Sequence, residues 1–81
     1  MRSHEEILGI VRDALIELFE LDAQQIVPEA RFVDLEIDSI DAVDLVDHLS
    51  RVFGRKVSPQ EFRAVRTVQN LVDTIERLQT Q

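Results

Sequence analysis

The sequence predicts an all-α fold, a small bundle of three main helices and one short helix with a long first connection. Apolar residues recur every three or four positions in three separate segments, as amphipathic helices require. Residues suited to capping helices flank those segments. We find no strand-like alternation, internal repeat or low-complexity tract. A chain of 81 residues suffices for one modest core, so we expect a single domain over residues 1–81.

The first helix is expected over residues 3–20. Ser3 and Glu6 fit a capping box, and Glu5 adds a second acid near the positive end of the helix dipole. The apolar stripe that should face the core comprises Ile7, Leu8, Val11, Ala14, Leu15, Leu18 and Phe19.

Residues 21–37 should form a long connection, because Pro28 disfavours helix around it. A connection of this length is usually functional or pinned to the core. The expected anchors are its apolar residues Leu21, Ile26, Phe32, Leu35 and Ile37.

A second helix is expected from Ser39 to Phe53, with Asp38 as N-cap and Gly54 just after its end. Its buried stripe should be Ala42, Leu45, Val46, Leu49, Val52 and Phe53. A separate acidic face carries Asp41, Asp44 and Asp47.

A short third helix should begin at Ser58, with Pro59 in its first turn and Glu61 at its third position. Thr67 should cap a last helix. That helix should be buried through Val68, Leu71, Val72, Ile75 and Leu78.

Composition excludes several classes of function. Sixteen acids against nine Lys and Arg give a net charge of −7, which would repel nucleic acid and favour partners with basic patches. The chain has no Cys, so it forms neither disulfides nor thiolate metal sites. No apolar run approaches the length of a membrane span and no signal peptide is evident, so we expect a cytoplasmic protein.

The segment from Asp34 to Leu45 holds the candidate chemistry, and a calcium loop is one interpretation. Asp34, Glu36 and Asp38 have the 1-3-5 spacing of an EF-hand. The sixth position should be Gly but is Ser39, and the twelfth should be Glu but is Leu45. The pattern therefore argues against a calcium loop.

A serine hydrolase is a second interpretation. Ser39 lacks the G-x-S-x-G context of a nucleophile elbow. His48 lies nine residues further along the same expected helix, roughly 13 Å away at 1.5 Å per residue. A nucleophile and its base must touch, so these two residues cannot act together.

A modified serine is the third interpretation. Ser39 would open a helix directly after a long loop, with its hydroxyl exposed. An anion attached there would face free backbone N–H groups and the positive end of the dipole. Alternatively, Asp38 and Ser39 are only helix-start residues, which spacing alone favours.

The sequence resembles the acyl carrier protein family. Asp38-Ser39-Ile40 is similar to its Asp-Ser-Leu signature, and residues 41–46 resemble the continuation D-x-V-E/D-L-V. Further similarity lies at Ile26, Pro28-Glu29, Phe32 and the last helix start Thr67-Val68-x-x-Leu71. The resemblance covers nearly the whole chain.

The resemblance implies a carrier without catalytic activity of its own. A carrier-protein synthase would transfer 4′-phosphopantetheine from coenzyme A to Ser39, and the terminal thiol would then hold an acyl group as a thioester. Asp38 would help the synthase hold magnesium. A monomer with no nucleic-acid partner would present this arm to ketosynthases and other acyl-processing enzymes with basic patches. The expected contacts are Asp41, Asp44 and Asp47 for basic patches, with Ile40 and Val43 as the apolar contact near the arm.

Three positions depart from the family pattern. Glu36 stands where Gly is usual, which would cost on the order of 1 kcal/mol if that position needs a positive φ. Asp47 stands where fatty-acid carriers often have Met, and Arg51 where they have an acid. Basic residues gather from there onward, at Arg51, Arg55, Lys56, Arg63 and Arg66.

These departures favour a specialised fatty-acid or polyketide-type pathway, in which Arg51 belongs to the partner face. Two alternatives remain open at this point. One is a carrier of aminoacyl or other thioesters, and the other is an unmodified acidic helical module that binds partners through its second helix.

Overall fold

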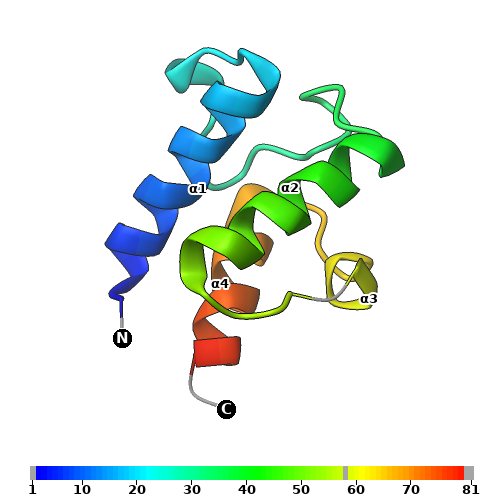
Figure 1. Ribbon diagram of the computed structural model, residues 1–81. Helices are drawn as coiled ribbons and strands as arrows, with labels where there is room; N and C mark the ends of the chain where they lie inside the picture. Colours follow the sequence, from blue (N-terminus) through cyan, green and yellow to red (C-terminus); the bar gives the residue numbers. More distant parts are fainter. Residues whose placement is uncertain (1, 58, 80–81) are drawn as a thin grey trace.

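The computed structural model describes residues 2–57 and 59–79, and its helices confirm the all-α bundle (Figure 1). The elements in chain order are α1 (His4–Phe19), the short 3₁₀ helix η1 (Ala23–Gln25), α2 (Ser39–Phe53), α3 (Pro59–Phe62) and α4 (Val68–Gln79). The only β-type pairing among the described residues is an isolated antiparallel bridge between Arg31 and Thr67. None of the described helices is both long and apolar enough to cross a bilayer.

Side-chain caps fix the start of the first and last helices. The Ser3 hydroxyl accepts from the Glu6 N–H at 3.2 Å, and the Glu6 carboxylate accepts from the Ser3 N–H at 3.1 Å. The Thr67 hydroxyl accepts from the Asn70 N–H at 3.1 Å. Both predicted caps are therefore confirmed, whereas the predicted cap Ser58 lies outside the described residues.

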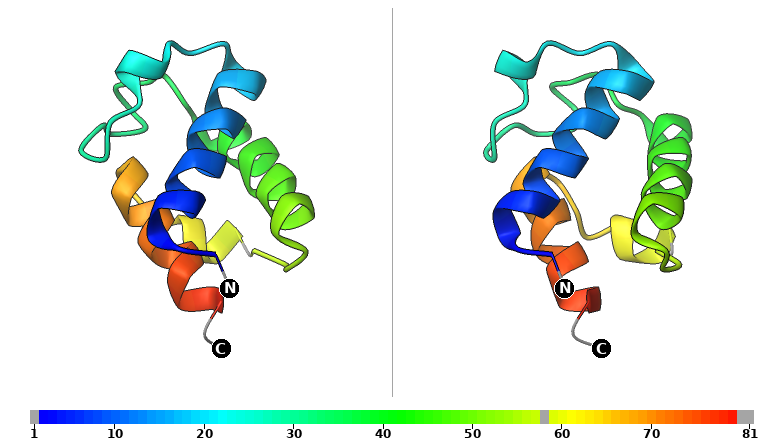
Figure 2. Two further views of the ribbon diagram at one scale, coloured as in Figure 1. Left: turned by 90° about the vertical axis from the view of Figure 1, so that its left-hand side faces the viewer. Right: turned by 60° about the vertical axis from the view of Figure 1, so that its left-hand side comes forward.

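The core lies where α1 packs against both α4 and α2, and α2 in turn contacts α3 (Figure 2). Its fully enclosed side chains are Ile7, Val11, Leu15, Leu45, Leu49, Val68, Leu71 and Val72. The predicted stripes supply all of them. Ala42, Leu8, Phe19, Phe53 and Leu78 are only partly buried.

The prediction that Leu18 and Val52 belong to the buried stripes is wrong. They are 37% and 39% exposed, respectively. Each lies in the last turn of its helix, where the apolar periodicity continues although the neighbouring helices no longer cover that face. Apolar periodicity predicts which face of a helix is buried, but it does not predict how far along that face a neighbouring helix covers it.

The long connection between α1 and α2 is pinned to the core, as predicted. Ile26, Phe32, Leu35 and Ile37 are buried, and Leu21 packs against them. Backbone hydrogen bonds also tie the connection to the segment that begins α4. Phe32 N–H donates to the Arg66 carbonyl at 3.0 Å, and Val68 N–H donates to the Ala30 carbonyl at 3.0 Å. These contacts fix the point at which the chain enters α2.

Candidate functional site

The start of α2 places a serine hydroxyl at the surface. Asp38 is the N-cap, and its Oδ1 accepts from the Ile40 N–H at 3.0 Å and from the Asp41 N–H at 2.9 Å. Ser39 follows as the first helical residue and is exposed. Gly54, with φ of 67°, ends the helix as predicted.

These caps correct one expectation about Ser39. An anion on its hydroxyl was expected to meet free backbone N–H groups, but Asp38 already accepts from two of them. A group attached to Ser39 would therefore share the positive end of α2 with the Asp38 carboxylate and extend toward solvent. Ser39 itself is exposed, which leaves room for a group attached to its hydroxyl.

Glu36 shapes the turn that leads into this site. Its φ is 60°, in the left-handed region that costs a non-glycine residue free energy. The turn closes through a hydrogen bond from the Ile37 N–H to the Phe32 carbonyl at 3.0 Å, and Ile37 is buried immediately after it. The backbone conformation expected for the usual glycine is thus retained, although the residue is Glu.

A cavity of about 520 Å³ opens beside Ser39, between α2 and the α3 region. Its lining residues are Phe32, Ile37, Asp38, Ser39, Ala42, Val43, Val46, Phe62, Arg63 and Val65. Phe32 and Phe62 form part of the wall, with ring centroids 5.4 Å apart. Most of the lining is apolar, and Arg63 adds a guanidinium.

Sequence analysis did not identify the residues that line this cavity. It assigned Phe32 to the core and Arg63 to a basic cluster, and nothing in their spacing joins them to Ser39. The cavity walls come from segments that only the tertiary fold brings together. The sequence itself shows only that Arg63 is the residue after Phe62, so that a cation stands next to an apolar residue of the cavity wall.

The outer face of α2 carries the side chains predicted to meet partners. Ile40 and Val43 are 75% and 56% exposed, so they present apolar surface directly after Ser39. Asp41 is half-buried and Asp44 is exposed. Apolar and acidic side chains therefore share this surface.

Asp47 and Arg51 form an ion pair one turn further along α2. Arg51 Nη2 lies 2.5 Å from Asp47 Oδ2, and both side chains are well exposed. Asp34, in the connection, pairs in the same way with Arg31 at 3.1 Å. Each pair is locally neutral, so the unneutralised acidity of α2 is concentrated at Asp41 and Asp44.

Comparison with known proteins gives a consistent result. The family model described as "Phosphopantetheine attachment site" matches residues 9–75. The chain is 42% identical over 74 residues to acyl carrier protein 2 of Ralstonia nicotianae, which covers 90% of this chain and 91% of that protein. It is 35% identical over 77 residues to the acyl carrier protein of Rubrobacter xylanophilus, covering 94% and 95%. It is also 37% identical over 78 residues to that of Thermotoga maritima, covering 95% and 96%.

Both comparisons span most of the chain, including α2 and the connection before it. The domain that matches carries covalently attached 4′-phosphopantetheine, and acyl carrier proteins are carriers and not enzymes. The exposed serine, the cavity beside it and the helical fold agree with this comparison. The chain belongs to the acyl carrier protein family.

Proposed function

We propose that Ser39 is the residue that bears 4′-phosphopantetheine, in a single carrier domain over residues 1–81. The observation that carries this proposal is the position of Ser39 as the exposed first residue of α2, on the lining of the cavity of about 520 Å³. The hydroxyl is open to a synthase from solvent. A chain attached to it can also turn back into an apolar space.

The surrounding residues suit a thioester-linked acyl chain. The arm supplies the thiol, which this chain lacks because it has no Cys. Val43, Val46 and Phe62 give the cavity apolar walls that would bury an acyl chain. Most of the lining is apolar, and its one acid, Asp38, is matched by one cation, Arg63, so the lining favours an apolar acyl chain over a charged aminoacyl group.

Asp38 is proposed to assist the synthase. The two hydrogen bonds that its side chain accepts both use Oδ1, so Oδ2 is the oxygen that could ligate a magnesium ion brought by the enzyme. The N-cap role and the magnesium role therefore use different oxygens of one carboxylate. Asp38→Asn should keep the cap while weakening the transfer reaction.

Ile40, Asp41, Val43, Asp44, Asp47 and Arg51 are proposed as the partner face. An apolar centre ringed by acids fits a synthase, a ketosynthase or another acyl-processing enzyme that offers a basic rim. The departures at Asp47 and Arg51 support a specialised fatty-acid or polyketide-type pathway. We further propose that the carrier acts as a cytoplasmic monomer.

Intact-mass spectrometry tests the central proposal. After incubation with coenzyme A and a broad-specificity carrier synthase, the wild type should gain the mass of one phosphopantetheinyl group. Ser39→Ala should gain none, whereas the control Ser3→Ala, at the distant cap of α1, should be modified like the wild type. A modified Ser39→Ala protein, or a wild type that several synthases leave unmodified, would overturn the proposal.

A further inference from the structure

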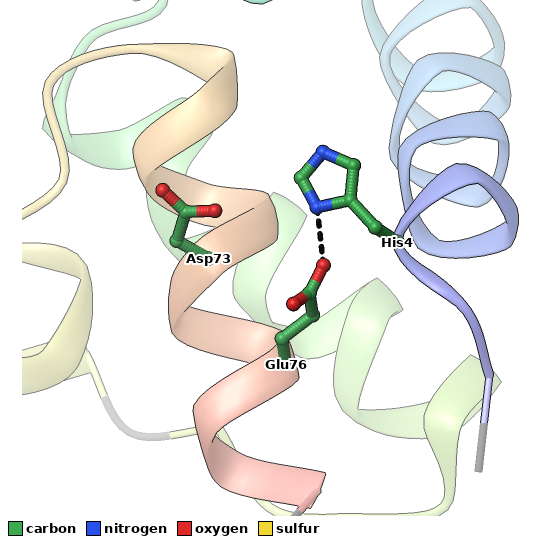
Figure 3. A group of neighbouring side chains, drawn as sticks. All are labelled: His4, Asp73 and Glu76. Atoms are coloured by element: carbon green, nitrogen blue, oxygen red, sulfur yellow. Dashed lines mark hydrogen bonds and ion pairs between the residues drawn. The ribbon is translucent and has the colours of Figure 1, made fainter.

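Three possible metal ligands meet where the beginning of α1 lies beside α4 (Figure 3). His4 projects from the first turn of α1, and Asp73 and Glu76 project from neighbouring turns of α4. One potential ligand atom from each residue lies within 4.8 Å of the other two. These three residues are called the terminal cluster below.

The terminal cluster does not depend on a flexible loop. Asp73 and Glu76 are three residues apart, so they share one face of α4. His4 Nδ1 already contacts Glu76 Oε1. Beneath them Ile7 on α1 and Ile75 on α4 are almost fully buried, which holds the two helices together.

A second clamp holds the same two chain segments in place. The Arg2 N–H donates to Gln79 Oε1 at 3.1 Å, and Gln79 Nε2 donates to the Arg2 carbonyl at 3.2 Å. The capping box of Ser3 and Glu6 fixes the backbone on either side of His4. The three potential ligands therefore need side-chain rotations only, and no movement of either helix, to converge on one ion.

The geometry points to a site for a divalent first-row transition ion such as Zn²⁺, held by His4, Asp73 and Glu76. One imidazole nitrogen and two carboxylate oxygens are a donor set that Zn²⁺ accepts, with water completing its coordination. Mg²⁺ and Ca²⁺ prefer all-oxygen shells with more ligands, so they fit this set less well. The His4 and Glu76 side chains are 49% and 38% exposed, which leaves the site open to an ion from solvent.

The ion would join α1 to α4, the helices nearest the two ends of the chain (Figure 1). Because unfolding separates these ligands, Zn²⁺ would stabilise the folded state by an amount that keeps rising with the logarithm of its concentration above Kd. The terminal cluster shares no residue with the cavity beside Ser39. The inference is therefore independent of the proposed modification and can be tested on unmodified and modified protein alike.

Calorimetric titration with ZnCl₂ tests the site. The wild type should bind one Zn²⁺ in a saturable step, and Co²⁺ in its place should give visible absorption bands that report nitrogen and oxygen ligands. His4→Gln and Asp73→Asn should each weaken binding by at least tenfold, because each removes a direct ligand and even the loss of a residue that only orients a ligand costs about tenfold or more. His48→Gln, which alters the other histidine, on α2, should leave this step unchanged.

Circular dichroism of each variant checks that the helices remain. If His4→Gln does not fold, Asp73→Asn and the position of paramagnetic broadening by Co²⁺ in the wild type decide instead. Broadening centred on residues 4, 73 and 76 supports the site. A titration without saturable binding, broadening centred on α2, or equal affinity in wild type and His4→Gln means that His4 and Glu76 form an ion pair only, and overturns the inference.

Discussion

At the scale of single residues, Glu36 is the clearest case of a side chain in an unfavourable backbone position. Its φ of 60° places Cβ close to the following carbonyl, which glycine avoids because it has no Cβ. We expect Glu36→Gly to raise the free energy of unfolding by about 1 kcal/mol, after allowing for the greater freedom of glycine in the unfolded chain. Urea denaturation at neutral pH measures the difference.

Two variants separate backbone strain from charge in this experiment. Glu36→Gln keeps the Cβ but removes the carboxylate, so it should recover little of the gain. Gly54→Ala makes the reverse change at the end of α2, where φ is 67° and no atom lies within 4 Å of an added Cβ, and it should destabilise the protein through strain alone. A Glu36→Gln variant as stable as Glu36→Gly would show that charge, and not φ, is responsible.

The residues around Ser39 also show what one sequence can predict. The Asp38 cap follows from local rules and was predicted. A positive φ at Glu36 was raised only as a condition, because the resembled family usually has glycine there, and the structure shows it. The occupation of two N–H groups by Asp38 was not predicted, because a list of cap-forming residues does not say how many donors the cap engages. Arg63 was not linked to Ser39, because the contact between their segments is made only in the folded chain.

At the scale of elements, the capping box at the start of α1 lowers the pKa of the Glu6 carboxyl group. The pKa of Glu6 is lowered from its ordinary value chiefly by the hydrogen bond from the Ser3 backbone N–H, and to a smaller extent by the hydrogen bond with the Ser3 hydroxyl. A group whose pKa is lowered on folding stabilises the protein above its unfolded-state pKa. That contribution is lost as the pH falls through the folded-state pKa.

Ser3→Ala should therefore raise the Glu6 pKa toward its ordinary value. The variant should lose more stability at neutral pH than at an acid pH where Glu6 is protonated in both states. The loss of the hydroxyl that accepts from the Glu6 N–H is the same at both pH values, whereas the loss of the bond that favours the ionised carboxylate matters only at neutral pH. NMR titration of the Glu6 carboxyl carbon measures the pKa, and thermal melts at the two pH values measure stability. A Glu6 pKa identical in wild type and variant would contradict this account.

The second helix and the loop before it contain a run of acidic residues. Six acids lie between Asp34 and Asp47 without a Lys or Arg among them. In the described structure Arg31 and Arg51 pair with the two outermost, and no ion pair involves Asp41 or Asp44. Acids three residues apart on a helix repel each other by a few tenths of a kcal/mol per pair.

Salt or millimolar Mg²⁺ should therefore raise the melting temperature, by about 3 °C or more for a domain of this size. Asp44→Asn removes the central charge of the series, so it should melt higher at low salt and gain less from Mg²⁺. Calorimetric melts at low and high salt, with and without Mg²⁺, measure both effects. A melting temperature that ignores both salt and Mg²⁺ would argue against repulsion on α2.

The positions of the helices in the sequence were easier to predict than which of their apolar residues neighbouring helices bury. The caps and apolar periods predicted α1 to within a residue at each end, both ends of α2, and the starts of α3 and α4, because both signals are local. Leu18 and Val52 were assigned to the core because they continue their stripes, and they are exposed because the neighbouring helices do not reach them. The terminal cluster could not be predicted from local patterns either, because His4 is far in sequence from Asp73 and Glu76.

At the scale of the whole molecule, the net charge of −7 favours the approach of partners with basic patches, and under the proposed function the details of α2 would decide which of them dock. Fatty-acid carriers, as the resemblance implies, often have an apolar side chain at the Asp47 position and acids around Arg51. Here those positions form a neutral ion pair on the exposed surface. An enzyme with an apolar patch and a basic rim would have to desolvate Asp47 and face the like charge of Arg51.

We therefore expect this carrier to be a poor substrate for a primary fatty-acid ketosynthase, and Asp47→Met with Arg51→Glu to improve it. The double change supplies the apolar contact and reverses the repelling charge together, so the gain in kcat/KM should be roughly tenfold, equivalent to about 1.4 kcal/mol. Asp47→Met alone leaves Arg51 without its carboxylate and facing the basic rim, so it should gain much less. The measurement is kcat/KM for the acylated wild type, the two single variants and the double variant. The expectation fails if the wild type already matches a fatty-acid carrier, or if the double variant is no better than the wild type, because either result would place the determinant of partner choice outside this ion pair.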